Sequence, residues 1–207
     1  MNPRTVLLAT RSAGKLRELR PMFAAAGWQV RDLAEAGIEE TPEEDALEAF
    51  ESFEENAVAK ARYFFARAGG LPVVADDSGL AVTALHGAPG VRSKRWSGRS
   101  DLAGVALDEA NNALLLQRLR GVEDRSARYV CAAVYWDGVR AFVSRGETLG
   151  RIAAARHGGA SGFGYDPYFE SVELGRAFSE VTGAEKAAVS HRGRAFRALL
   201  KSVADGG

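Results

Sequence analysis

Apolar and polar positions along the chain form short runs that predict strands and helices in turn. The first apolar run, Thr5 to Ala9, is typical of a short buried strand, and a turn follows at residues 12–14. A helix is expected from Lys15 to Ala25, because its apolar residues recur on one face, and Gly27 ends it. Trp28 to Leu33 is a second candidate strand. This opening of strand, loop, helix and strand is typical of an α/β protein.

Helical spacing sets in again near Phe50, where an apolar stripe runs on to Phe65 before Gly69-Gly70 ends it. Leu71 to Ala75 is then expected to be a strand that runs into a turn at Asp76-Asp77-Ser78-Gly79. A second strand-like piece follows at Leu80 to Leu85.

The rest of the chain continues the mixture of helices and strands. The expected elements are a helix at Leu102 to Leu119, strands at Ala127 to Trp136 and Val139 to Glu147 joined by the hairpin signal Asp137-Gly138, a glycine-rich loop at Gly158 to Gly164, and mostly helical structure from Ala184 to Ala204. No internal repeat or linker interrupts this pattern. We therefore predict one α/β domain over residues 1–207 with a mixed sheet and at most a small lobe.

Composition narrows the class of protein. Lys plus Arg and Asp plus Glu each number 27, so no net charge draws the chain to nucleic acid or to a membrane. The apolar run at Val6 to Ala9 is too short for a signal peptide or a membrane span. The single cysteine, Cys131, lies in an apolar run and has no intrachain partner for a disulfide. These features predict a soluble, cytoplasmic protein with a buried thiol.

Thr10 to Lys15 is a candidate phosphate-binding loop. Backbone N–H groups at a strand-to-helix turn form an anion site, and Lys15 adds a point charge suited to phosphate. The loop lacks the G-x-x-x-x-G-K-[ST] spacing of a Walker A motif. Since strand–glycine–helix turns are common in α/β proteins, a solvated Lys15 is an alternative.

Asp76 and Asp77 give a sharper signal, because they follow an apolar strand. Ligands in open α/β sheets bind at the carboxyl ends of strands. Two adjacent carboxylates repel each other unless a cation or donors compensate, and their oxygens suit Mg²⁺. The alternative is a turn stabilised by Asx hydrogen bonds.

A second source of carboxylates is the stretch from Glu39 to Glu55, which holds nine acidic residues and no Lys or Arg. Most of these residues are expected to be a solvated face. Glu48 lies just ahead of the helical stripe and could supply a metal ligand, although spacing alone does not favour it over Glu44 or Glu51.

Two further segments carry donors and aromatic rings. Ser190-His191-Arg192-Gly193 lies between two helical stretches and, with Lys186, offers donors for carbonyl or phosphate oxygens. Phe163-Gly164-Tyr165-Asp166 offers aromatic faces on which a base could stack, or else packs in the core.

Taken together, these segments resemble the inosine triphosphatase family, the Ham1-like pyrophosphatases of non-standard purine nucleoside triphosphates. The matching motifs occur in the family's order and run from residue 9 to residue 193. They are Ala9-Thr10 to Gly14-Lys15, Ser52-Phe-Glu-Glu-Asn-Ala57, Ala75-Asp-Asp-Ser-Gly-Leu80, Gly87-Ala-Pro-Gly90, Gly162-Phe-Gly-Tyr-Asp-Pro167 and Ser190-His-Arg-Gly193.

The resemblance implies cleavage of ITP, dITP and XTP between the α- and β-phosphates, which gives the monophosphate and pyrophosphate. It also implies an elongated α/β fold with a mixed sheet flanked by helices, two lobes with a central nucleotide cleft, and a homodimer. No nucleic-acid or membrane partner is expected.

The same resemblance assigns roles to individual residues. Asp77 is the general base, and Glu48 and Asp77 bind Mg²⁺. The residues expected to bind substrate are Thr10, Arg11, Ser12, Ala13, Gly14, Lys15, Ser78, Phe163, Gly164, Tyr165, Asp166, Lys186, His191 and Arg192.

This chain departs from the family pattern in two places. Arg11 and Ser12 stand where the family usually has Gly and Asn, so the phosphate contact of Ser12 is in question. Glu48-Ala-Phe50 stands where the family commonly has Glu-Thr-Gly, which weakens the assignment of Glu48.

Donor and acceptor matching accounts for selectivity in this interpretation. Lys186, His191 or Arg192 donates to a purine 6-oxo group, whereas adenine presents a 6-amino donor at that position. Two alternatives stay open. One is a Maf-like pyrophosphatase, against which the motifs at 163–166 and 190–193 count, and the other is a nucleotide-binding module without catalysis.

Overall fold

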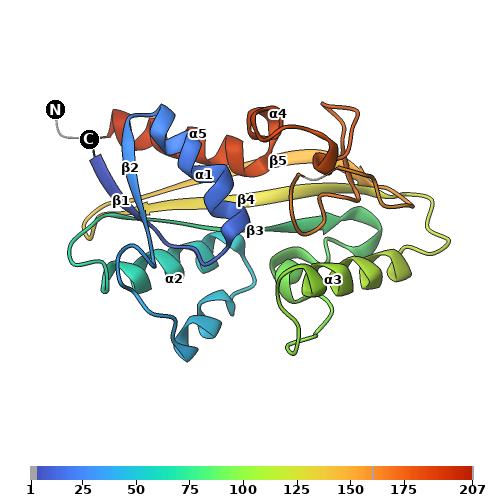
Figure 1. Cartoon of the computed structure of the whole chain (residues 1–207), viewed down its shortest axis with the longest axis horizontal. Helices are drawn as coiled ribbons and strands as arrows, with labels where there is room; N and C mark the ends of the chain where they lie inside the picture. The colour runs from blue at the N-terminus through green and yellow to red at the C-terminus, as the bar shows by residue number, and fades with distance from the viewer. Residues whose placement is uncertain (1–3, 160, 207) are drawn as a thin grey trace. The chain divides into compact units, whose positions relative to one another are not determined.

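The computed structural model describes residues 4–159 and 161–206, which contain both strands and helices (Figure 1). The strands are β1 (Arg4–Leu8), β2 (Trp28–Asp32), β3 (Val73–Val82), β4 (Ser126–Trp136), β5 (Ala141–Ile152) and β6 (Phe169–Ser171). The helices are α1 (Ala13–Ala25), α2 (Phe53–Phe65), α3 (Gly104–Arg118), α4 (Gly183–Val189) and α5 (His191–Asp205). The predicted glycine-rich loop at 158–164 includes residue 160, which lies outside the described residues.

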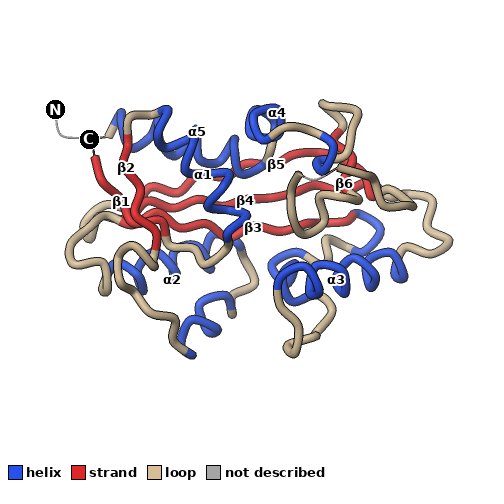
Figure 2. Tube along the Cα trace, in the orientation of Figure 1, coloured by secondary structure: helices blue, strands red, loops and turns tan. Residues whose placement is uncertain are grey.

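The strands form one sheet in the order β2-β1-β3-β4-β5-β6 (Figure 2). β1 pairs in parallel with β2 and with β3, whereas β5 and β6 are antiparallel. Helix α1 connects the parallel strands β1 and β2, as the sequence predicts for a βαβ start. The prediction of an α/β fold with a mixed sheet is confirmed.

The chain divides into two compact units. The first contains the residues up to Asp77, Cys131–Gly146 and the residues from Arg192 onward, and the second contains Ser78–Val130 and Glu147–His191. Strands β3, β4 and β5 contribute residues to both units.

In the first unit, helices cover both faces of the strands (Figure 1). Apolar side chains of α1 and α5 pack against β1, β3 and β4, and Phe23 meets Phe196 edge to face at 5.8 Å between ring centroids. Helix α2 lies on the other face and buries its apolar stripe there. The core of the second unit contains Tyr129, Phe169 and Phe178, together with Leu115 of α3.

Several predicted boundaries are wrong: the strand expected to end at Glu147 runs on to Ile152, and two differences lie near the candidate site. Helix α2 begins at Phe53 rather than near Phe50, because the Ser52 side chain accepts a hydrogen bond from the Glu55 N–H and caps the helix. Asp76-Asp77-Ser78-Gly79 is not a turn between two strands, since β3 runs unbroken from Val73 to Val82. The two aspartates therefore lie within a strand, where neighbouring side chains point to opposite faces.

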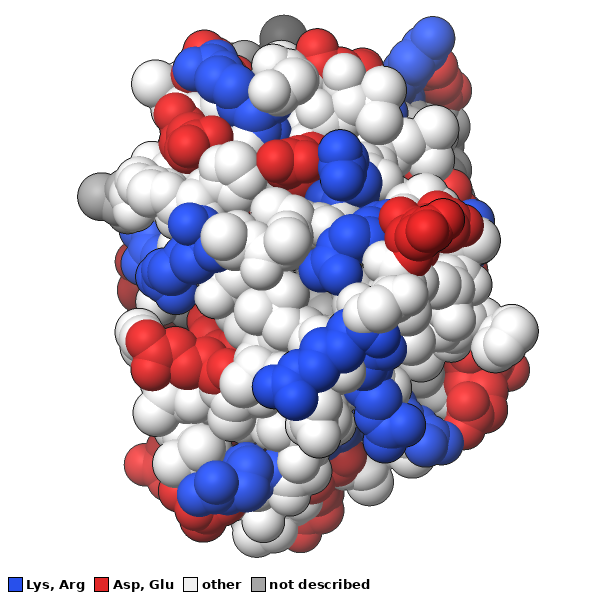
Figure 3. Space-filling view, turned by 90° about the vertical axis from the view of Figure 1, so that its right-hand side faces the viewer, with Lys and Arg blue, Asp and Glu red and all other residues white. Residues whose placement is uncertain are grey.

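Charges of both signs are interspersed on the face drawn in Figure 3, in keeping with the equal numbers of acidic and basic residues. Within residues 4–159 and 161–206, no helix combines the length and the apolar character that crossing a bilayer requires.

Candidate active site

The candidate phosphate loop is the entry into α1. Ser12 is the N-cap of this helix, and its hydroxyl accepts a hydrogen bond from the Lys15 N–H at 3.3 Å. The Ser12 N–H donates to the Thr10 hydroxyl at 3.1 Å. Ala13 and Gly14 form the first turn of the helix, whose remaining backbone N–H groups have no partner within the helix. The loop is thus shaped by its own hydroxyl groups.

Arg11 points away from this capping arrangement and toward the acidic stretch. Its guanidinium forms two hydrogen bonds with the Glu44 carboxylate, at 2.7 and 3.1 Å, and a third with the Ile38 carbonyl at 2.9 Å. Glu44 belongs to the 3₁₀ helix η1 (Pro42–Glu48), which also carries Glu48. Arg11 therefore connects the candidate phosphate loop to the segment of the candidate metal ligand.

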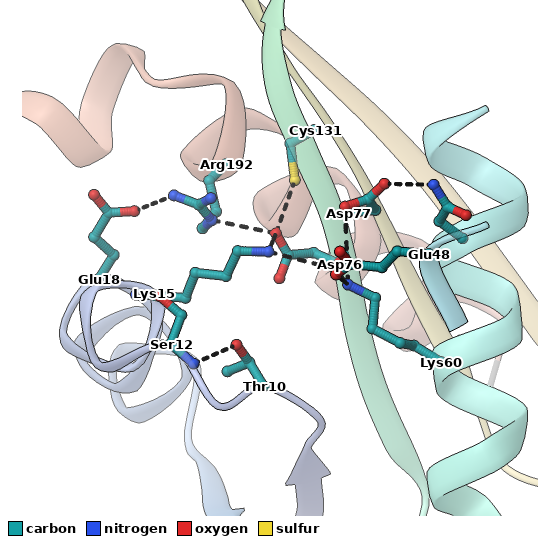
Figure 4. Close-up of polar contacts among 11 residues, drawn as sticks. Thr10, Ser12, Lys15, Glu18, Glu48, Lys60, Asp76, Asp77, Cys131 and Arg192 are labelled. Carbon is teal, nitrogen blue, oxygen red and sulfur yellow. Dashed lines mark hydrogen bonds and ion pairs between the residues drawn. The ribbon is translucent and has the colours of Figure 1, made fainter. Parts of the chain in front are cut away.

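Asp76 faces a group of cations on the α1 and α5 side of β3 (Figure 4). Its Oδ2 lies 2.9 Å from the Lys15 ammonium and 3.4 Å from Nε of Arg192. Arg192 in turn forms a short ion pair with Glu18 of α1. The Cys131 sulfur lies 3.8 Å from the same Asp76 oxygen, and this thiol is fully buried, as predicted.

This surrounding fixes the charge of Asp76. Burial by itself would raise the pKa of Asp76, but the Lys15 ammonium and the Arg192 guanidinium outweigh it and hold the pKa well below its usual range. Burial raises the pKa of the Cys131 thiol, so the thiol stays protonated and unreactive.

Asp77 faces the opposite side of the strand, toward α2 (Figure 4). Its Oδ2 accepts a hydrogen bond from the Asn56 amide at 2.9 Å. Its Oδ1 lies 3.8 Å from the Lys60 ammonium. Lys60 also pairs with Glu48 at 2.7 Å and donates to the Asp76 carbonyl at 2.9 Å. Lys60 of α2 thus contacts both Asp77 and Glu48, while Asn56 of the same helix contacts Asp77.

The electrostatic balance at Asp77 differs from that at Asp76. Burial raises the pKa of Asp77, and Lys60 and Lys15 only partly oppose it. For Lys60, burial alone would lower the pKa, but Glu48 and Asp77 outweigh burial and raise it. Asp77 is accordingly the carboxylate of the pair with the greater affinity for a proton.

The chemistry of these groups fits a hard divalent cation. Glu48 and Asp77 both lie near the Lys60 ammonium, and their oxygens are the ligand type that Mg²⁺ prefers. Among the described residues, no three His, Cys, Asp or Glu side chains gather into a metal centre. A cation between these two carboxylates would therefore draw its other ligands from substrate and water.

A second cluster, in the second unit, contains the candidate base-binding residues. Lys186 of α4 and Asp166 form a buried ion pair at 2.6 Å, and the Lys186 ammonium lies 5.1 Å from the centroid of the Phe163 ring. Asp166 also accepts a hydrogen bond from the Phe163 N–H at 2.8 Å. A Cβ at Gly162 would overlap the Asp166 carboxylate, and its φ of +85° favours glycine.

His191 and Tyr165 complete this cluster. The His191 ring stacks on Tyr129 at 4.5 Å between centroids, with an interplanar angle of 11°. The Tyr165 hydroxyl donates to the Ser93 carbonyl at 2.7 Å and is not turned toward solvent. Tyr129 is also within 3.4 Å of Asp166 through its hydroxyl, so it contacts two members of the cluster.

The structure thus divides the predicted site residues between two groups. Thr10 to Lys15, Glu48, Asp77 and Arg192 lie in the first unit, and Phe163 to Asp166, Lys186 and His191 lie in the second. Ser78 follows Asp77 in β3 and belongs to the second unit. The contacts of Arg192 with Glu18 and Asp76 place it beside the candidate phosphate loop.

The sequence analysis missed Asn56 and Lys60 as site residues. Both are buried on the apolar stripe of α2, four residues apart, and both contact Asp77. Two polar residues at i and i+4 within an apolar stripe were the available signal. Glu18 was also missed, and the sequence holds no comparable signal for it.

Comparisons with known proteins identify the family of this chain. The model of the Ham1 family matches residues 6–202. The dITP/XTP pyrophosphatase of Frankia alni is 50% identical over 198 residues, which cover 94% of each chain. That of Thermus thermophilus is 45% identical over 205 residues, covering 97% of this chain and 92% of the relative.

Solved structures of Ham1 proteins also match this chain over nearly its whole length. A HAM1 protein from Coxiella burnetii is 32% identical with a TM-score of 0.80, and the match covers 97% of this chain and 98% of that one. The nucleoside-triphosphatase / dITP/XTP pyrophosphatase of Mycobacterium abscessus is 42% identical with a TM-score of 0.68, over 95% and 98% of the two chains. The chain therefore belongs to the Ham1 family.

Proposed function

We propose that this chain is an enzyme that hydrolyses ITP, dITP and XTP to the monophosphate and pyrophosphate, and thereby removes non-standard purines from the nucleotide pool. Its relatives named dITP/XTP pyrophosphatase support the reaction class. The observation that carries the proposal is the contrast within β3. One buried carboxylate, Asp76, is held ionised by cations, and its neighbour Asp77 has a raised pKa beside Glu48 and Lys60.

Asp77 is the general base in this proposal. The attacking water loses its proton to Asp77, its oxygen bonds to the α-phosphorus, and the bond between that phosphorus and the bridging oxygen breaks to release pyrophosphate. A raised pKa brings a carboxylate closer to the range in which a general base works well near neutral pH. Asn56 fixes the orientation of the carboxylate by donating to its Oδ2.

Mg²⁺ belongs to the proposal as the cation that Glu48 and Asp77 hold. Held by these two carboxylates, a bound Mg²⁺ would offset the negative charge that builds on the phosphate oxygens. Lys15 and the first-turn amides of α1 hold the phosphates in line for attack, since they form the anion site at the helix start. Arg192, engaged by Glu18 and Asp76, maintains the ionised state of Asp76 and so holds Lys15 in place.

Base recognition is assigned to the second cluster. Lys186 and His191 offer donors for a 6-oxo group, and the Phe163 ring offers a stacking surface. Adenine would leave a buried donor unpaired, at a cost of about 1–3 kcal/mol. We extend the proposal to the cytoplasm as the place of action, and to a homodimer.

The test is a substrate panel with pyrophosphate detection. ITP, dITP, XTP, GTP and ATP are each incubated with the purified protein, with and without added Mg²⁺. Rapid pyrophosphate release from ITP, dITP and XTP that depends on Mg²⁺ is expected. Binding without any pyrophosphate release would identify a nucleotide-binding module instead, and a preference for pyrimidine or modified nucleotides would favour a Maf-like activity.

A further inference from the structure

Helix α3 lies outside all of the matching motifs, yet it forms hydrogen bonds with the backbone of Gly164 in the second cluster. Helix α3 presents Asp108 and Asn112 on one face, because residues four apart lie one above the other. Oδ2 of Asp108 accepts a hydrogen bond from the Gly164 N–H at 2.8 Å. The Asn112 amide donates to the Gly164 carbonyl at 3.0 Å. Both backbone polar groups of Gly164 are thus held by a single turn of α3.

These two hydrogen bonds fix the backbone of Gly164, where the chain changes direction. Its φ is +62°, a left-handed conformation that glycine adopts at little cost. It lies between Phe163, the proposed stacking surface, and Tyr165, whose hydroxyl is bound to the Ser93 carbonyl at 2.7 Å. Because glycine has no side chain to anchor it, its backbone bonds to α3 fix one end of Phe163, whose own N–H is held by Asp166.

Asn112 is suited to a fixed role of this kind. Only 4% of the residue is exposed, and its amide donates to the Asp108 carbonyl at 2.8 Å as well as to Gly164. The amide orientation is therefore set by two acceptors at once. Asp108 takes part through two groups: its backbone carbonyl accepts from the Asn112 amide, and its carboxylate accepts from the Gly164 N–H.

We propose that Asp108 and Asn112 are positioning residues that set purine selectivity by fixing Gly164, and with it the plane on which the base stacks. The inference rests on the proposed hydrolysis of purine nucleoside triphosphates. Neither residue contacts the reacting phosphates in this scheme. Their loss loosens the hold on the base while the groups around Asp77 stay intact, so binding of the nucleotide should suffer more than turnover.

The experiment compares Asp108→Ala and Asn112→Asp with two matched controls. Asn112→Asp keeps the size of the side chain but replaces the donor by an acceptor that repels the Gly164 carbonyl. Asp108→Asn retains a carbonyl oxygen that can accept the Gly164 N–H. Glu109→Ala removes the adjacent, exposed carboxylate of the same helix.

Steady-state kinetics with ITP and ATP supply the first readout. In Asp108→Ala and Asn112→Asp, we expect KM for ITP to rise roughly tenfold, while kcat changes by less than about threefold. A change of this size in KM corresponds to the loss of one hydrogen bond to the substrate-binding segment. The ratio of kcat/KM for ITP to that for ATP falls by a similar factor. Asp108→Asn and Glu109→Ala keep the wild-type ratio.

Titration with IMP and with pyrophosphate separates positioning from general damage. IMP binding weakens about tenfold in the two variants, and inhibition by pyrophosphate stays at the wild-type level. Equal weakening of both ligands, or an unchanged ITP-to-ATP ratio in folded Asp108→Ala and Asn112→Asp, would overturn the inference alone. A wild-type protein that releases no pyrophosphate from ITP and binds no IMP would overturn the proposed function with it.

Discussion

The two clusters handle charge in opposite ways. The phosphate cluster of the first unit consists of Lys15, Lys60 and Arg192 with four carboxylates around β3. Several of its ion pairs share a partner. The base cluster of the second unit contains the ion pair of Lys186 with Asp166, which lies between the Phe163 and Phe178 rings. Shared charges can rearrange when a polyanion binds, whereas the buried pair of Lys186 with Asp166 fixes its donor in place. Rate is therefore expected to depend on the first cluster, and selectivity on the second.

Removing the general base gives the largest expected effect and tests the first half of this comparison. Asp77→Asn keeps the shape of the side chain but cannot take a proton, so kcat for ITP should fall by about 10²- to 10⁴-fold. IMP binding and the preference for IMP over AMP should stay at the wild-type level. Calorimetric titration with both monophosphates supplies the check, and near wild-type turnover would remove Asp77 from the mechanism.

The same substitution has a predictable sign for stability. Because burial raises the pKa of folded Asp77, its ionisation at neutral pH disfavours the folded state. Asp77→Asn should therefore have a melting temperature at pH 7 that is equal to or above that of the wild type. A lower melting temperature would show that the ionised carboxylate stabilises the fold.

Asp76→Asn is expected to act mainly on stability. It leaves Lys15 and Arg192 without their shared buried carboxylate, and breaking a buried ion pair costs about 3–5 kcal/mol. The pKa of folded Asp76 is lowered, so its contribution is present above about pH 4, the pKa of an unfolded aspartate, and is lost as the pH falls further. Urea unfolding should show a large deficit at pH 7 that narrows toward pH 3. A deficit of equal size at both pH values would contradict this account.

Lys186→Met tests the second half of the comparison. Loss of the donor should reduce the ratio of kcat/KM for ITP to that for ATP by roughly 10- to 100-fold, the equivalent of one buried unpaired group. Since the variant leaves Asp166 buried and unpaired, Lys186→Met with Asp166→Asn is measured beside it. The double variant should regain stability in urea but not selectivity. Recovery of selectivity would mean that Lys186 acts only by neutralising Asp166.

Arg11→Ala gives the smallest expected effect and decides what this residue does. If its bond to Glu44 is its role, the half-buried pair contributes about 0.5–1 kcal/mol, and Glu44→Gln has a similar effect. The double variant should then be no worse than either single one, and KM for ITP should change by less than about threefold. A tenfold higher KM in Arg11→Ala alone would instead support the predicted contact with substrate phosphate.

The course of the first strands and helices followed from local pattern, but β3 did not. Asp76-Asp77-Ser78-Gly79 has the composition of a turn, yet it lies within a strand, where Lys15, Lys60 and Arg192 compensate its two buried carboxylates. Those cations come from segments far away in the sequence, and composition carries no information about which of them meet.

The same difference applies to the site residues: those that interrupt a local pattern could be found from the sequence, and those brought together over long distances could not. Asn56 and Lys60 were visible as polar interruptions of an apolar stripe, so the sequence contained their signal. The pair of Arg192 with Glu18 joins residues 174 positions apart and leaves no local trace. The hydrogen bond from the Gly164 N–H to Asp108 likewise joins residues 56 positions apart, and hydrophobic periodicity cannot reveal such a contact.

Asp76 and Asp77 are the same amino acid, and only the pleat of β3 assigns them different work. An extra residue inserted just before this strand could slide the chain by one place relative to its neighbours, and a slip of this kind turns every side chain to the other face. Asp76 would then meet Asn56 and Lys60, while Ala75 would face Lys15 and Arg192 and leave those cations without a carboxylate. The alignment of β3 with its neighbouring strands is therefore as much a catalytic determinant as either aspartate.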